Sequence, residues 1–286
     1  MVERRKPRRR FSPLRALGDR AGALSPARHS LTWAFALLGL IIFLFITVPL
    51  LKMLVSSVAE AEAFWTTLID RQVVESISLT LYAALIATIV GFFLGVPLAY
   101  LLARHDFRGK RLVEGLIDVP IVVPHTAAGI ALLFVFGRSF AVGATFARFG
   151  ISFVDSTAGI VIAMLFVSVP FLIDSAKEGF KKVDPRLEKV ARSLGATPWQ
   201  VFVRISFPLA WQSIAAGGIM MWARGISEFG AVVILTYHPM IAPVLIFERF
   251  EAFGLDYARP VAVILIIISV LAFVALRLLV NRGEEA

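Results

Sequence analysis

Long stretches without a charged residue constrain this chain most. Leu31–Leu51 holds 21 uncharged residues and Ser76–Ala103 holds 28. About 20 apolar residues allow an α-helix to cross a bilayer, where every backbone polar group must be paired within the protein. Of the 286 residues, 58% are hydrophobic and only 17% are charged. The sequence therefore predicts an all-α polytopic membrane protein.

Prolines interrupt the third apolar segment. Pro120 and Pro124 lie four residues apart, and the uncharged stretch resumes over 126–137. Proline lacks a backbone donor and bends a helix. In lipid, such a break survives only where it is packed in protein or lines a water-filled path. We therefore expect a broken third span that is packed in protein or faces a water-filled path.

Three more apolar segments complete a prediction of six transmembrane helices. They are the fourth span at 156–173, the fifth from 205 to about 235, and the sixth at 260–276, with a half-inserted helix at 244–253 in the loop before the sixth.

Positive charge is distributed unevenly between the two sides of this arrangement. A basic arm at 1–30 carries nine Lys and Arg residues, 104–111 carries four, 177–204 carries seven, and two follow position 276. These segments share one side and hold 22 of the 29 Lys and Arg residues. Because Lys and Arg gather in cytoplasmic loops, we expect both termini, including the tail 279–286, to be cytoplasmic. Basic residues beside membrane spans determine the membrane topology, so we do not expect this chain to bind nucleic acid.

A polar, basic segment at 184–209 separates the fourth and fifth spans, and we name it the coupling element. Asp184 and the proline after it predict a helix start, and Gly195 predicts its end. Residues 197–200 form a capping box that opens a second short helix, expected to end at Pro208. The first helix places its apolar residues on one face: Leu187, Val190, Ala191 and Leu194.

The coupling element resembles the "EAA" signature of permease subunits of ATP-binding-cassette importers, through Ala191-Arg-Ser-Leu-Gly195, then Phe202, Ile205 and Pro208-Leu209. The usual Glu-Ala-Ala opening is replaced by Lys189-Val190-Ala191, with Glu188 one place early. The resemblance implies a cytoplasmic loop that docks into a groove on a separate ATPase. A plain basic loop between two spans is the alternative. The implied coupling residues are Glu188, Lys189, Ala191, Leu194, Gly195, Ala196, Phe202 and Pro208.

Arg224 and Glu228 lie four residues apart in the expected fifth span, so they share a helix face and can pair. Each would cost about 2.5–3.5 kcal/mol at a lipid-facing helix centre. We therefore expect both to point toward protein or water. Two interpretations stay open: a gate or pathway element, and a structural ion pair that fixes helix packing.

Three stretches resemble members of one importer family. Residues 223–230 resemble sulfate and molybdate/tungstate permeases, and 120–133 look like the third-span segment of molybdate-type permeases. Residues 243–250 are similar to the late external loop of archaeal-type molybdate/tungstate members. The resemblance covers about 72–278 and implies a type I ABC importer transmembrane domain, preceded by a first helix at 31–55.

An oxyanion pathway needs donors without excess charge. Backbone amides at helix starts and hydroxyl groups bind dianions in this way. His125 is a candidate donor, and the alternative is a role in packing or in an interhelical hydrogen bond. His125 does not indicate a metal site, because no second metal ligand lies three or four positions further along the chain. The pathway or gate candidates are Pro120, Pro124, His125, Thr126, Arg224, Ser227 and Glu228.

The sequence contains no phosphate-binding G-x-x-x-x-G-K-[ST] loop, no catalytic constellation and no cysteine. We therefore expect a transport subunit, not an enzyme, without a cofactor or metal of its own. The resemblance implies that ATP and Mg²⁺ are bound by cytoplasmic ABC ATPase subunits. It also implies a second copy of the permease and an extracytoplasmic oxyanion-binding protein in the cell membrane. Molybdate or tungstate is the expected cargo; sulfate or thiosulfate import, and a gradient-driven transporter or channel, are the alternatives.

Overall fold

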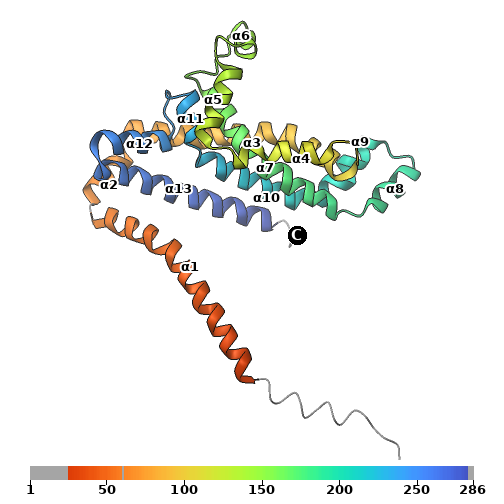
Figure 1. The fold of residues 1–286 in the computed structure, drawn as a ribbon, viewed down its shortest axis with the longest axis horizontal. Coiled ribbons are helices and arrows are strands. Elements are labelled where there is room, and N and C mark those ends of the chain that lie inside the picture. Colours follow the sequence, from red (N-terminus) through yellow and green to blue (C-terminus); the bar gives the residue numbers. More distant parts are fainter. Residues whose placement is uncertain (1–24, 60, 283–286) are drawn as a thin grey trace, which may run out of the picture. The chain divides into compact units, whose positions relative to one another are not determined.

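The computed structural model describes residues 25–59 and 61–282, and these ranges contain helices and short connections but no strand. The chain separates into two compact units, residues 1–56 and residues 57–286 (Figure 1).

The first unit contains most of helix α1 (Ser25–Ala59). Its segment Leu31–Ser57 is long and apolar enough to cross a membrane, which agrees with the first span predicted from the sequence. A hydroxyl within it is satisfied locally, because Thr47 Oγ1 donates to the Phe43 carbonyl at 2.8 Å. Such back-bonding keeps a polar side chain compatible with an apolar helix.

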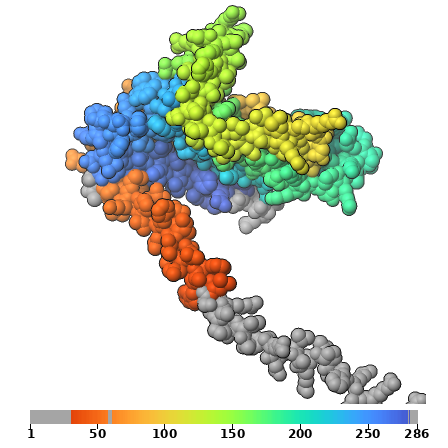
Figure 2. All heavy atoms as spheres, viewed as in Figure 1, coloured from red at the N-terminus to blue at the C-terminus, as the bar shows by residue number. Residues whose placement is uncertain are grey.

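The second unit is a bundle of helices with a protruding element at one end. Figure 1 shows α8 and α9 at that end and α2 and α12 at the opposite end, and in Figure 2 α5 and α6 project from the side of the bundle. The elements are α2 (Ala61–Leu68), α3 (Arg71–Arg104), α4 (Lys110–Val122), α5 (His125–Phe136), α6 (Ala141–Ala147), α7 (Thr157–Lys182), α8 (Pro185–Ser193), α9 (Pro198–Val201), the π-helical turn η1 (Phe202–Ser206), α10 (Phe207–Ile226), α11 (Gly230–Leu235), α12 (Ala242–Phe253) and α13 (Leu255–Arg282).

Helix α7 lies at the centre of the second unit and packs against α3 and α10. It begins after Ser156, whose hydroxyl accepts a hydrogen bond from the Gly159 amide at 3.2 Å, as an N-cap residue does. Its buried face carries apolar side chains that include Ile160, Leu172 and Phe180, all shielded from solvent. The core of the bundle is therefore the surface that α7 shares with its two neighbours.

Small residues allow α7 and α10 to approach closely. A Cβ atom on Gly217 of α10 would lie 2.7 Å from Ser175 Cβ and 3.2 Å from Leu172 Cα. A Cβ atom on Gly179 of α7 would lie 2.5 Å from Ser213 Cβ. Between these points, Ser175 Oγ donates to the Ser213 carbonyl at 2.6 Å. Close backbone approach at small residues, reinforced by interhelical hydrogen bonds, is the usual way helices associate in lipid.

The predicted count of six spans is not confirmed by helix length and composition. In residues 31–278, four helices qualify, in α1, α3, α7 and α13, and the bent pair α4–α5 is a fifth candidate. Helix α10 has 20 residues and is not among the helices that qualify. The expected break in the third apolar segment is confirmed, because α4 and α5 meet at an angle of 115°, as in a broken span or a re-entrant loop.

The expectation of an unbroken fifth span is wrong. Helix α10 ends at Ile226 and α11 begins at Gly230, so residues 227–229 form a second break. This break contains no proline, and nothing in the local sequence pattern predicted it.

We predict that Gly217→Ala lowers the thermal unfolding midpoint of the detergent-purified protein by a few degrees, because the new methyl group overlaps Ser175 and the Leu172 backbone. Overpacking of this kind costs about 1–3 kcal/mol. The matched control is Gly218→Ala, where only Thr88 Cγ2 lies near, at 3.9 Å. Alanine favours a helix over glycine by about 1 kcal/mol, so the control should be unchanged or stabilised. Equal midpoints for the two variants would contradict this packing.

Candidate functional site

The coupling element folds as its local sequence predicts. The Asp184 carboxylate accepts from the Arg186 amide at 2.9 Å and caps α8. Gly195 then adopts a positive φ of 90°, which ends the helix in a conformation that favours glycine. The predicted capping box is present at α9, where Gln200 Oε1 accepts from the Thr197 amide at 2.8 Å and Thr197 Oγ1 accepts from the Gln200 amide at 3.3 Å.

The outer face of the coupling element is apolar and uncovered. Leu194 is 83% exposed and Trp199 is 71% exposed, and Leu187 and Val190 of the same face of α8 are also exposed. Lys189 and Gly195 are exposed beside them, whereas Ala191 and Ala196 are half-buried. Several large apolar side chains on one protruding element indicate a surface for a protein partner.

The inner side of the coupling element is held by aromatic contacts. Phe202 is half-buried, and its ring lies 5.0 Å from that of Tyr100 and 5.7 Å from that of Trp199. Phe202 thus anchors the element to α3 instead of facing outward. The prediction that the second short helix ends at Pro208 is wrong, because α9, η1 and α10 follow one another without a gap and Pro208 lies in the first turn of α10. Proline removes one helical hydrogen bond there, and the π-helical turn η1 lies directly before it, where the hydrogen-bond pattern of the helix changes.

Glu188 ties the coupling element to α3. Its carboxylate oxygen Oε1 lies 2.7 Å from Arg104 Nε and accepts from Ser206 Oγ at 2.7 Å, and Tyr100 donates to Oε2 at 3.4 Å. Arg104 Nη2 also donates to the Val183 carbonyl at 3.0 Å. The sequence named Glu188 but none of its partners, because Arg104 and Tyr100 are more than 80 positions away along the chain.

The second part of the site lies where the two helix breaks meet. Pro124 is the N-cap of α5, and His125 begins that helix. Glu228 lies between α10 and α11. A Cβ atom on Gly230 would lie 2.7 Å from His125 Cβ, and one on Gly129 would lie 2.8 Å from the Ala231 carbonyl oxygen. Helices α5 and α11 therefore pack directly against each other, with both breaks at one level.

His125, Arg224, Ser227 and Glu228 form what we name the charged cluster. Arg224 Nη2 lies 3.0 Å from Glu228 Oε2 and 2.7 Å from His125 Nε2. His125 Nδ1 lies 3.3 Å from Glu228 Oε2, and Arg224 Nη1 donates to Ser227 Oγ at 3.2 Å. The second Glu228 oxygen accepts from the Ala231 amide at 2.8 Å. One carboxylate thus satisfies a free amide of α11 and the guanidinium of α10.

The predicted Arg224–Glu228 pairing is confirmed, but the helical reason given for it is wrong, because Glu228 lies outside α10. The cluster is open on one side. Glu228 is only 1% exposed, whereas the side chains of Arg224 and His125 are 23% and 38% exposed. The guanidinium of Arg224 offers N–H donors to an anion, with its charge balanced by the carboxylate, whereas both ring nitrogens of His125 already face Arg224 or Glu228.

Two predicted pathway residues do not join the charged cluster. Thr126 is exposed, and its backbone amide lies 3.2 Å from the position of a Cβ on Gly230. Pro120 is buried inside α4. Neither side chain makes a hydrogen bond within the described residues.

Sequence reasoning missed a further polar contact between α4 and α7. Lys177 Nζ lies 2.8 Å from Asp174 Oδ1 and 3.6 Å from Glu114 Oε1. Asp118 Oδ1 is buried nearby on α4 without a hydrogen-bond partner in the described part of the chain. The spacing of Glu114 and Asp118, at i and i+4 of one helix, was the available signal. Among the residues described, no group of three or more His, Asp or Glu side chains could hold a metal ion.

A family comparison agrees with this arrangement. Residues 91–282 match the family described as "Binding-protein-dependent transport system inner membrane component". The match covers more than half of the chain, and the chain belongs to this family.

Named relatives and a solved structure extend the comparison. The molybdate/tungstate transport system permease protein WtpB of Pyrococcus furiosus is 46% identical over 259 residues, which cover 91% of this chain and 99% of that protein. A probable sulfate transport system permease protein, cysT of Chlorokybus atmophyticus, is 32% identical, over 89% of this chain and 90% of that protein. The fold resembles a chain in the crystal structure of a bacterial ABC transporter that imports alginate, with a TM-score of 0.71, 17% identity and coverage of 90% and 96%.

We predict that Arg224→Met destabilises the purified protein more than Arg224→Met combined with Glu228→Gln. The single change leaves the buried carboxylate without its cation, and losing one partner of a buried pair costs about 3–5 kcal/mol. The glutamine in the double variant keeps an oxygen for the Ala231 amide. Thermal unfolding in detergent measures the difference, with Thr126→Ala as a control that removes one exposed hydroxyl outside the cluster. A double variant no more stable than the single one would show that the two side chains do not stabilise each other.

Proposed function

We propose that this chain is the permease subunit of an ATP-driven importer for molybdate or tungstate in the cell membrane. The observation that carries this proposal is the 46% identity to a molybdate/tungstate permease over nearly the whole length of both chains. The protruding apolar face at one end of the bundle supports the ATP-driven part, because it supplies a docking surface for a separate ATPase.

The coupling element and both termini face the cytoplasm in this proposal. The segments that the sequence predicts on their side of the membrane contain 22 of the 29 Lys and Arg residues, and such a bias sets membrane orientation. The end of the bundle that carries α2 and α12 then faces outward.

Two ATPase subunits supply the energy and bind the ATP and Mg²⁺. Each grips one coupling element through the exposed face of α8. Because Glu188 joins that element to Arg104 at the end of α3, a movement of the element is passed to a helix that runs the length of the bundle. The permease itself undergoes rigid-body movement and carries out no catalytic step.

The open side of the charged cluster supports a homodimer. Arg224 and His125 are partly exposed on the surface of a single chain, and a charge that faces hydrocarbon is costly. A second copy of the permease, with an aqueous path between the two, covers this surface. Dianions with four acceptor oxygens then pass nitrogen and hydroxyl donors from both copies, and high-affinity selection is left to an extracytoplasmic binding protein.

We predict that Leu194→Ser reduces co-purification of the partner ATPase at least tenfold, because it removes the most exposed apolar side chain of the docking face. Loss of about 1.4 kcal/mol corresponds to this factor. The matched control is Arg192→Ser on the opposite side of α8, which should retain the ATPase. Retention of the ATPase by both variants would contradict docking through this face.

We predict ATP-dependent uptake of labelled tungstate by vesicles that contain the permease, its ATPase and its binding protein. An excess of molybdate should inhibit this uptake, and sulfate at the same concentration as that molybdate should not. Competition by sulfate equal to that by molybdate would favour the sulfate importer suggested by the 32% identical relative. Uptake that persists without ATP would favour a gradient-driven transporter or channel.

A further inference from the structure

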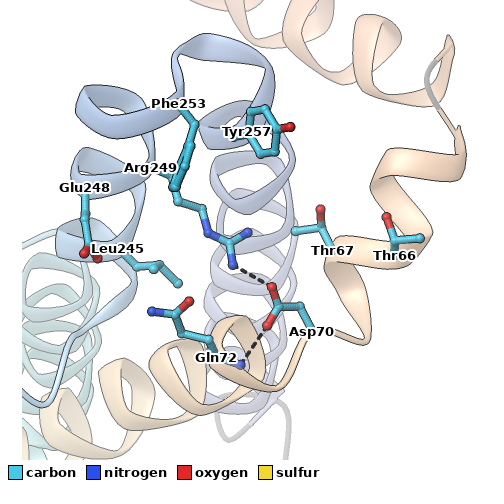
Figure 3. A pocket seen from close by; sticks show the side chains of 9 residues that line it. All are labelled: Thr66, Thr67, Asp70, Gln72, Leu245, Glu248, Arg249, Phe253 and Tyr257. Atoms are coloured by element: carbon cyan, nitrogen blue, oxygen red, sulfur yellow. Dashed lines mark hydrogen bonds and ion pairs between the residues drawn. The ribbon is translucent and has the colours of Figure 1, made fainter.

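A pocket of about 410 Å³ lies at the end of the second unit opposite α8 and α9, and we name it the outer pocket. It is enclosed by α2, α12 and the first turns of α3 and α13, and it shares no residue with the charged cluster or the coupling element. Figure 3 shows the residues that line it, which are Thr66, Thr67, Asp70, Gln72, Leu245, Glu248, Arg249, Phe253 and Tyr257.

The positive charge in the outer pocket is already compensated. Arg249 Nη2 lies 2.6 Å from Asp70 Oδ2, and the other Asp70 oxygen accepts from the Gln72 amide at 2.8 Å. Partial burial raises the pKa of Asp70, but the hydrogen bonds from Arg249 and from the Gln72 amide outweigh it and hold this pKa below its ordinary value. Asp70 is therefore ionised at neutral pH, and the Arg249–Asp70 pair carries no net charge.

The second carboxylate of the outer pocket has no such partner. Glu248 Oε2 is buried and makes no hydrogen bond within the described residues, and no ion pair of Glu248 is found there either. In Figure 3, Glu248 leaves α12 on the side of the pocket away from Asp70. The charged side chains that line the pocket are two carboxylates, Asp70 and Glu248, and one guanidinium, Arg249, and a half-buried carboxylate without a partner favours a cationic donor.

Two aromatic rings lie at the end of the outer pocket away from Gln72 (Figure 3). The ring centroids of Phe253 and Tyr257 are 5.4 Å apart, and both rings are exposed. Aromatic faces suit the alkyl stem of a long basic side chain and attract its cationic end. Together with Glu248, they match the shape and charge of lysine or arginine better than those of an acidic or neutral polar group.

We propose that the outer pocket receives a lysine or arginine side chain of the extracytoplasmic binding protein, whose cationic end pairs with Glu248. This proposal rests on the proposed function, which places α2 and α12 outside the cell. An occupant of the pocket touches Asp70, the N-cap of α3, while the other end of α3 holds the coupling element through Arg104. The binding protein outside and the ATPase inside would thus both act on helix α3, at its opposite ends.

The test uses the complete permease–ATPase complex in lipid nanodiscs and its purified, tungstate-loaded binding protein. We predict that Glu248→Gln weakens docking at least tenfold, mainly through faster dissociation, as loss of one partner of a buried interfacial pair does. The control is Glu251→Gln, an exposed carboxylate on the same helix α12, which should dock within about twofold of the wild type, or about 0.4 kcal/mol. Charge reversal at Glu248 should be rescued by an acidic replacement of one basic residue on the binding protein.

Docking that is unchanged in Glu248→Gln, or weakened equally in Glu251→Gln, would overturn the assignment of the outer pocket. These outcomes are distinct from failure of the proposed function. If the wild-type complex bound no binding protein and showed no ATP-dependent uptake, the importer itself would be refuted. A wild-type complex that docks and transports, with Glu248→Gln indistinguishable from it, would refute the pocket alone.

Discussion

The hydrocarbon interior of a bilayer contains no water to satisfy an interrupted helix, and this constraint governs the second unit. The bundle satisfies this constraint because its two helix breaks, between α4 and α5 and between α10 and α11, pack against each other. Glu228 accepts the Ala231 amide with one oxygen and faces Arg224 and His125 with the other. The same carboxylate therefore stabilises the start of α11, neutralises a charge on α10 and contacts the start of α5. The polar side chains at the two breaks therefore form the charged cluster, in which Arg224 and His125 are partly exposed.

Helix α3 connects the two ends of this arrangement. At one end, Asp70 caps the helix and pairs with Arg249 of α12. At the other end, Arg104 pairs with Glu188 of the coupling element. Between them, α3 packs along α7, which also packs along α10. Under the proposed function, a docking event at either end would act on one continuous set of packed helices, as rigid-body coupling requires.

The sequence predicted those features that depend on near neighbours. The caps at Asp184 and Thr197 and the turn at Gly195 are set by residues within three or four positions. The contacts of Glu188 with Arg104 and of His125 with Arg224 join residues 84 and 99 positions apart, so local patterns contain no signal for them.

The two errors have different causes. The break after Ile226 contains no proline, and it is stabilised by Glu228 and by tertiary contacts with α5. Pro208 suggested a helix end, but the helix continues through it, with the π-helical turn η1 directly before it.

The location of the coupling element tests the central claim most directly, and the absence of cysteine from the chain makes the measurement simple. Leu194→Cys and Glu251→Cys place one thiol at each end of the second unit in cells that express the permease without its ATPase. A membrane-impermeant maleimide should label Glu251→Cys in intact cells and Leu194→Cys only after the membrane is opened. Labelling of Leu194→Cys in intact cells would place the coupling element outside and contradict the account.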